Sequence, residues 1–523
     1  MTNGARNPWV IAPLVAMAAF MEVLDISIAN VALQHIAGNL SAGQEESTWI
    51  LTSYLVTNAI VLPISGWMSA VMGRKRFFMT CIAGFSISSL LCGLAPNLAL
   101  LILFRGIQGL TGGGLQPSAQ AILSDSFPPH QRGMAFALYG MAVVFAPAIG
   151  PTLGGWITDV ASWRWVFLLN VPVGIVLFRL IHAVVSDPPA LTVAREERRR
   201  IGFSIDYLGF SLLVIWVGCL QFVLDRGQQD DWFNSPLIIG MSVASVVALA
   251  AFIVWELGQD DPIVDLNLLA HRNFAVANLL MFVLGFVLLG TTVLLPEMVQ
   301  RLMGYTATLA GLVITPGGLT IIFIMPIIGR ILSHVDARYL IAAGMVTCGL
   351  AIYHMTGFNL QTDYASFMWA RIYQAVGLSL LFIPINAVAY VGIPQIHSST
   401  ASALINMSRN LGGSIGISVV TTLLARGAQR HQTELVSHAT PSAPAWHRMI
   451  ESLTGLFVHH GDILTTAGTK ASAQVYSLIN RQALMLAFID DFRALAVCFL
   501  LLAPLVFLMD KVTHARPPAG AAH

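Results

Sequence analysis

The chain has 523 residues, of which 56% are hydrophobic and only 10% are charged, and its formal net charge at pH 7 is +1. Soluble globular proteins carry about 25% charged residues, so this chain has too few to cover a surface that faces water. The composition therefore excludes a soluble protein, gives no sign of a nucleic-acid partner, and predicts an all-α polytopic membrane protein.

Apolar segments close to the roughly 20 residues that a helix needs to cross a bilayer recur along the chain. We expect fourteen such helices, at 9–33, 47–72, 77–95, 98–123, 133–157, 165–185, 206–224, 236–256, 273–295, 307–332, 339–357, 365–388, 398–424 and 485–509. Most loop arginines, including Arg74, Arg76 and the run 195–200, then share one side with both termini. The excess of positive charge predicts that this side is cytoplasmic.

The first predicted helix carries two acids, Glu22 and Asp25, in an otherwise almost entirely apolar segment. A charge at the bilayer centre costs about 2.5–3.5 kcal/mol, so two carboxylates there indicate binding of a proton, a cation or both. Their spacing puts them on one helix face, where both cannot ionise cheaply. We expect this pair, together with Arg105, to serve proton coupling, with one of the two acids holding a proton. Glu22 could instead meet a cationic part of a substrate. The alternative is an acid that only pairs with a neighbouring helix.

The fourth predicted helix places Arg105 near the middle of the membrane, where a permanently protonated guanidinium needs a partner. The candidates are Asp25 and a backbone carbonyl of the fifth helix. A contact with Asp25 that forms and breaks would act as a proton switch, whereas a permanent contact would be structural. Gln108 and Gly109 are expected to support this packing. In the fifth helix, a run of Gly and Pro predicts a tight packing seam that can also bend or seal one side.

An internal repeat is visible, because Arg105-x-x-Gln108 recurs as Arg371-x-x-Gln374 and Gly150 recurs as Gly416, both 266 residues later. This predicts two six-helix bundles in the same orientation, at 1–185 and 273–523, with two inserted helices within 186–272. Parallel repeats of this kind hold a substrate near mid-membrane between them. No acid obviously mirrors Asp25, so Arg371 is interpreted as mainly structural. Arg409 is expected to line a cavity or lie near its inner mouth.

Five segments resemble sequence motifs of the major facilitator superfamily, and within it the fourteen-helix drug:proton antiporters of the EmrB/QacA type, closest to EmrB-like proteins. They are Leu24–Leu33, Gly66–Arg76, Leu103–Gly109, Pro147–Gly155 and Trp163–Pro172. The second segment departs from the pattern at Ala70, where many members carry Asp. The motif residues expected to serve the conformational change are Gly66, Gly73, Arg74, Gln108, Gly109, Pro147, Gly150, Pro151, Gly154 and Gly155.

The resemblance implies a proton-coupled exporter of hydrophobic or cationic toxic compounds in a bacterial inner membrane, with Asp25 as the proton-coupled acid. It also implies a periplasmic adaptor similar to EmrA and an outer-membrane channel as partners, and no cofactor. An exporter of one specific metabolite remains an alternative. A membrane enzyme or sensor is disfavoured because no Ser/His or His/Asp/Glu cluster marks one interface.

A cavity for amphipathic compounds should combine apolar walls with a few polar groups. The candidates for its polar lining are Glu22, Asn30, Trp49, Tyr54, Asn58, Gln116, Asn386 and Arg409. The only long segment expected outside the membrane, 425–484, contains several histidines but no tight spacing of metal ligands. We predict that it forms a partly helical periplasmic loop, and adaptor docking is a reasonable use for it.

Overall fold

The computed structural model describes residues 7–188, 191–193, 195–196, 206–259, 262–440 and 443–510. Residues 197–200 of the predicted arginine-rich linker lie outside these ranges. The described residues form α-helices and short 3-10 helices without any strand, so the predicted all-α class is confirmed. The first part of the chain contains α1 (Pro8–Asn39), α2 (Gln44–Met72), α3 (Arg74–Gly93), α4 (Leu98–Gly112), α5 (Leu115–Ser126), α6 (Pro129–Val160), α7 (Arg164–Leu168) and α8 (Asn170–Val184).

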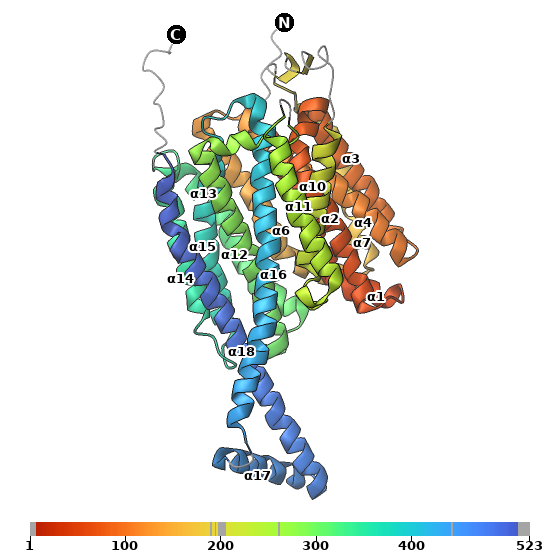
Figure 1. Ribbon diagram of the computed structural model, residues 1–523, viewed down its shortest axis with the longest axis vertical. Helices are drawn as coiled ribbons and strands as arrows, with labels where there is room; N and C mark the ends of the chain where they lie inside the picture. Colours follow the sequence, from red (N-terminus) through yellow and green to blue (C-terminus); the bar gives the residue numbers. More distant parts are fainter. Residues whose placement is uncertain are drawn as a thin grey trace.

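The remaining helices follow in the same up-and-down order (Figure 1). They are α10 (Tyr207–Arg226), η1 (Trp232–Asn234), α11 (Pro236–Glu256), η2 (Leu266–Ala270), α12 (Arg272–Met303), α13 (Ala307–Ile331), α14 (Ala337–Met355), α15 (Tyr364–Ala389), η3 (Gln395–His397), α16 (Ser398–His438), α17 (Pro444–His459), α18 (Leu464–Leu502) and η4 (Ala503–Leu508). The predicted helix 98–123 is divided into α4 and α5 around Gly113 and Gly114, and 165–185 is divided into α7 and α8.

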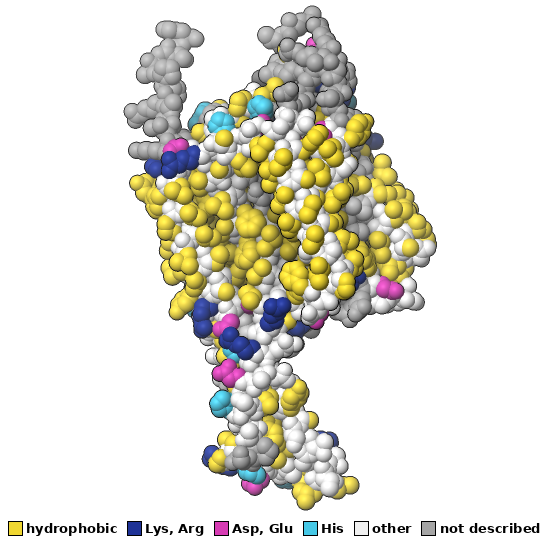
Figure 2. Space-filling view, in the orientation of Figure 1, with side chains coloured by type: hydrophobic (Ala, Val, Ile, Leu, Met, Phe, Trp, Pro, Cys, Tyr) yellow, Lys and Arg dark blue, Asp and Glu magenta, His cyan; other side chains and the backbone are white. Residues whose placement is uncertain are grey.

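Thirteen helical segments within the described residues are long and apolar enough to cross a membrane. The further predicted span, 339–357, corresponds to α14, a helix of 19 residues that packs against α15 and α18. Arg338 and His354 near its two ends make it less apolar than the others. Figure 2 shows apolar side chains over the sides of the bundle and charged side chains gathered at its two ends, as a lipid-exposed surface requires.

Helix packing repeats between the two halves of the chain. In the first half, α1 packs on α6, α2 on α4, and α3 on both α4 and α8. In the second half, α12 packs on α16, α13 on α15, and α14 on both α15 and α18. Each pair therefore has a counterpart at the same place in the other half. The inserted helices α10 and α11 pack on each other, and α10 also contacts α2 and α16.

The two ends of the bundle differ in shape (Figure 1). We call the end where α1 begins and η4 ends the terminal end, and the opposite end the hairpin end, because α16, α17 and α18 project from it as a helical hairpin. The predicted helix boundaries near 424 and 485 are wrong, since α16 continues to His438 and α18 already begins at Leu464. Hydropathy detects only the apolar part of each helix, whereas their projecting parts are polar helix-forming sequence.

Candidate functional site

Asp25 of α1 lies at the centre of a buried group of polar side chains. Arg105 of α4 forms an ion pair with its carboxylate at 2.6 Å, and both side chains are fully buried. Gln108, one turn from Arg105, donates to the other carboxylate oxygen at 3.1 Å and accepts from Arg105 at 2.8 Å. Asn170, the first residue of α8, donates to Asp25 at 2.6 Å and to Ser89 of α3 at 3.0 Å. Three helices, α1, α4 and α8, therefore meet at one carboxylate, and α3 is connected to it through Asn170.

Aromatic rings cover the guanidinium of Arg105. Its central carbon lies 4.4 Å from the ring centre of Tyr54 and 5.4 Å from that of Phe167, and its Nε donates to the Ile50 carbonyl at 3.3 Å. Rings in these positions add a cation–π attraction to the ion pair with Asp25. Protonation of Asp25 would remove the counter-charge and leave Arg105 buried without it, which is costly.

Close helix contacts hold this group together. A Cβ at Gly109 of α4 would overlap atoms of α2, and a Cβ at Gly150 of α6 would overlap Ser27 of α1. At Gly154, a Cβ would meet Ile28 of α1 at 3.0 Å. Only glycine lets these backbones approach so closely, which explains in part why the motif glycines stand at these positions.

Glu22 belongs to a second polar group, which joins the two halves. Asn58 of α2 donates to Glu22 at 3.1 Å, and the other Glu22 oxygen is buried without a hydrogen-bond partner among the described residues. Gln116 of α5 accepts a short hydrogen bond from Arg409 of α16, and the Tyr139 hydroxyl lies 3.5 Å from the same oxygen. The Gln116 side chain lies beside the Glu22 carboxyl group, and the charge of Arg409 also acts on it.

The other predicted cavity residues differ in their surroundings. Tyr54 joins the two polar groups, since its ring covers Arg105 and its hydroxyl lies 3.4 Å from the amide nitrogen of Asn58. Trp49 instead packs on Phe222 of α10, away from these contacts, and Asn30 is exposed. Asn386 is buried in α15 and donates to a backbone carbonyl of its own helix at 2.8 Å.

The second half repeats the Arg-x-x-Gln arrangement without an acid. Arg371 and Gln374 of α15 both bond to Thr291 of α12, at 3.4 and 2.8 Å. Thr291 stands 266 residues after Asp25, the offset of the repeat. The offset of 266 residues therefore identifies Thr291 from the sequence, although Thr291 is not among the residues predicted above. The sequence analysis also missed Asn170, although this residue lies inside the fifth motif segment.

The terminal end is closed by contacts between the halves. Arg74, which follows α2, pairs with Asp125 of α5 and also donates to Ser399 of α16 at 2.7 Å and to the Gln395 carbonyl at 2.7 Å. A Cβ at Gly66 would meet the Cα of Thr400 at 2.7 Å.

The α2–α3 turn just before Arg74 depends on glycine. Gly73 has φ +90°, a conformation that other residues rarely adopt, and this turn aims Arg74 across to the second half.

Known proteins match this architecture along the whole chain. A family model described as Major Facilitator Superfamily matches residues 15–417. The fatty acid resistance protein FarB of Neisseria gonorrhoeae is 37% identical over 521 residues, which cover 100% of this chain and 99% of that protein. The multidrug export protein EmrB of Escherichia coli (strain K12) is 37% identical over 507 residues, covering 97% and 95%. The human organic anion transporter MFSD10 has the same fold, with a TM-score of 0.58 at 14% identity, covering 96% and 99%.

Proposed function

The chain belongs to the major facilitator superfamily, and from this premise we propose that it is a proton-coupled multidrug efflux transporter of the bacterial inner membrane. The observation that carries the coupling is the fully buried pair of Asp25 and Arg105. One proton that moves through about 100 mV supplies about 2.3 kcal/mol. At about 1.4 kcal/mol per tenfold, this sustains roughly a 50-fold gradient of a neutral compound.

In the proposed cycle, Asp25 exchanges its proton as the halves rock about the contacts between them. The deprotonated acid holds Arg105, Gln108 and Asn170 as the structure has them. Protonation weakens the ion pair and frees α1 to move. The group around Glu22 and Arg409, which spans both halves, contacts the polar part of a substrate in this proposal, because each residue keeps one buried polar atom without a partner among the described residues.

The proposal includes a sidedness and a division of the chain. The terminal end faces the cytoplasm, and the hairpin end faces the periplasm, as the distribution of loop arginines predicts. Residues 1–185 and 273–523 form the two bundles, and 186–272 contain the inserted helices. The named relatives comprise a multidrug export protein and a fatty acid resistance protein. We therefore propose that the substrates include hydrophobic cations and amphipathic weak acids.

The test of proton coupling uses inverted membrane vesicles that hold a preformed pH gradient. Addition of a transported compound is expected to collapse the gradient with the wild-type protein, and Asp25→Asn is expected to abolish this response. Asn preserves the size of the side chain and one acceptor oxygen, so the fold should be kept. Asp159→Asn is the matched control, because Asp159 is exposed at the end of α6. This variant should exchange protons for the compound at the wild-type rate. Normal exchange by Asp25→Asn would refute the assignment of the acid.

We further propose that the projecting hairpin binds a periplasmic adaptor that continues the export path. Support comes from α17, whose apolar residues Met449, Leu456 and Val458 are exposed far from the bundle (Figure 1). Replacement of Pro444–His459 by a flexible linker should leave proton exchange in vesicles intact and remove drug resistance in cells. Resistance at the wild-type level would contradict the adaptor proposal without affecting the coupling proposal.

A further inference from the structure

Arg371 of α15 is a buried cation whose hydrogen-bond partners are all neutral. It donates to the side-chain oxygen of Gln374 at 2.6 Å, to Thr292 at 3.0 Å and to Thr291 at 3.4 Å. No carboxylate oxygen of the described residues lies within 4.0 Å of it, whereas its counterpart Arg105 pairs with Asp25 at 2.6 Å. The two halves therefore hold equivalent arginines in different electrostatic surroundings.

A guanidinium stays protonated in proteins, so the second half carries a permanent positive charge within the membrane-spanning region. Neutral hydroxyl and amide oxygens satisfy its hydrogen bonds but do not cancel its charge. Residues of this kind usually pair with an opposite charge or face a pathway for ions or substrates. Since Thr291 stands where the repeat would place an acid, the part of the chain that the structure describes supplies no such charge beside Arg371.

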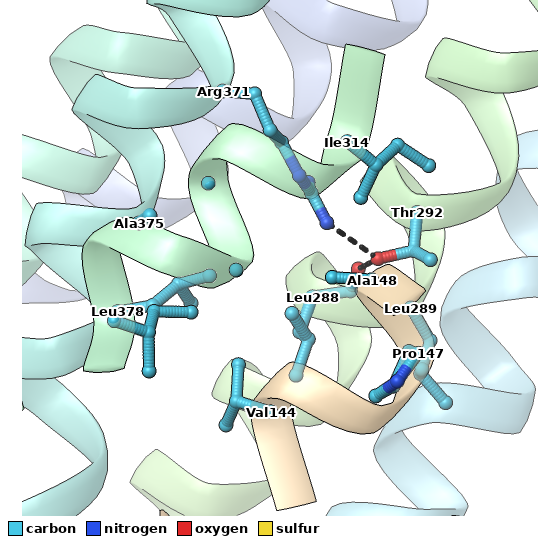
Figure 3. A pocket seen from close by; sticks show the side chains of 13 residues that line it. Val144, Pro147, Ala148, Leu288, Leu289, Thr292, Ile314, Arg371, Ala375 and Leu378 are labelled. Atoms are coloured by element: carbon cyan, nitrogen blue, oxygen red, sulfur yellow. Dashed lines mark hydrogen bonds between the residues drawn. The ribbon is translucent and has the colours of Figure 1, made fainter. Parts of the chain in front are cut away.

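A small cavity lies next to Arg371, between the two halves (Figure 3). Its open space is about 30 Å³, enough for one water molecule or one carboxylate group. The polar side chains of its lining are Arg371 and Thr292, and the rest is apolar, with Leu288, Ile314 and Leu378 from the second half. The α6 segment with Val144, Pro147 and Ala148 closes it from the first half.

We propose that this cavity receives the carboxylate of an amphipathic weak acid, with Arg371 as its counter-charge. The Thr292 hydroxyl donates to the Leu288 carbonyl at 2.7 Å in this structure, and it would turn to donate to the bound carboxylate. The apolar walls would contact the first methylene groups of the acid. A single cation beside one hydroxyl suits a monoanion better than a doubly charged phosphate ester. The inference rests on the proposed export function and assigns one substrate class to one place within it.

The position of the cavity connects it to the proposed proton site. The carbonyl of Pro147 accepts a hydrogen bond of 3.4 Å from Ser27, two residues after Asp25 on α1. The carbonyl of Ala148 accepts one of 3.3 Å from Thr315 of α13. The same turn of α6 therefore contacts the helix of the proton-binding acid on one side and lines the carboxylate cavity on the other. Entry of a carboxylate would displace this turn relative to α1.

The test measures equilibrium binding of radiolabelled decanoate and of tetraphenylphosphonium, a lipophilic cation, to the purified full-length protein. Arg371→Gln is expected to lower the ratio of decanoate affinity to cation affinity at least tenfold, and Arg371→Lys less than threefold. Thr292→Val keeps the shape and the buried charge, and should lower the same ratio about threefold; it carries the test if the Gln variant does not fold. Arg493→Gln, at an exposed arginine of α18, is the matched control.

The outcomes separate this inference from the proposed function. If the wild-type protein exchanges protons for the cation in vesicles but does not bind decanoate, the carboxylate site is refuted and export stands. If it exchanges protons for neither probe, the proposed function itself is refuted. Arg371→Gln could lower the affinities for decanoate and for the cation equally, or both Arg371→Gln and Thr292→Val could leave the ratio of these affinities unchanged. Either result would show that Arg371 only supports the fold.

Discussion

The hydroxyl of Ser399 contacts two residues of the other half at the terminal end. It accepts from the Nε of Arg74 at 2.7 Å and lies 3.1 Å from the Ser69 hydroxyl, and both partners belong to the other half. Ser399→Ala removes these contacts without adding bulk. We therefore expect the variant to open more often at the terminal end.

The size of the effect follows from the charge on Arg74. A hydrogen bond to a charged group contributes about 1.5–3 kcal/mol. At about 1.4 kcal/mol per tenfold, its loss should raise the ratio of open to closed molecules by roughly ten- to a hundred-fold. Arg74 retains its contacts with Asp125 and the Gln395 carbonyl, so the closed arrangement remains accessible.

Double electron–electron resonance spectroscopy measures distances between spin labels and can therefore report the ratio of open to closed molecules. Arg76 and His334 are exposed at the terminal end in opposite halves and suit the labels, after replacement of the five native cysteines. Ser379→Ala is the matched control, because this buried hydroxyl bonds only to a carbonyl of its own helix. A distance distribution in Ser399→Ala that equals both the parent and this control would refute the assignment of a lock between the halves.

Three further variants test the packing that surrounds the site. Gly109→Ala should destabilise the protein by about 1–3 kcal/mol in thermal unfolding, because its Cβ overlaps α2. The control Gly106→Ala should be tolerated, because its Cβ meets one atom at 3.8 Å. Equal melting temperatures of the two variants would contradict this expectation. Gly66→Ala should widen the label distances at the terminal end, since its Cβ meets backbone of the other half at 2.7 Å, and unchanged distances would count against that contact. Asn170→Ala removes a donor at 2.6 Å from Asp25 and should slow proton–drug exchange in vesicles at least tenfold, and a normal rate would exclude this role.

The sequence predicts the helices well because a bilayer imposes a strict length and polarity on anything that crosses it. It also names Asp25 as one of two candidate partners of Arg105, beside a backbone carbonyl of the fifth helix, since a buried arginine in a membrane needs a partner. The structure brings Asp25 and Arg105 to 2.6 Å. Whether Asp25 carries the coupled proton stays a prediction.

Other features depend on packing that no local pattern encodes. Trp49 shares a helix with Tyr54 and Asn58, yet the inserted helix α10 covers it, and nothing in the pattern of α2 reports where α10 packs. Arg409 reaches Gln116 across the boundary between the halves, a contact over 293 positions of the chain. Asn170 reaches Asp25 across 145 positions of the chain.

The uninterrupted course of α16 has a mechanical consequence. At 1.5 Å per residue, its 41 residues extend about 62 Å, roughly twice the hydrocarbon thickness of a bilayer. The helix contains no proline, so its outer part acts as a stiff lever on the bundle. A tilt of about 10° during transport would swing its far tip by roughly 5 Å. In the proposed transport cycle, movement within the membrane would thereby produce displacement about 30 Å beyond the hydrocarbon layer, where the proposed adaptor would meet it.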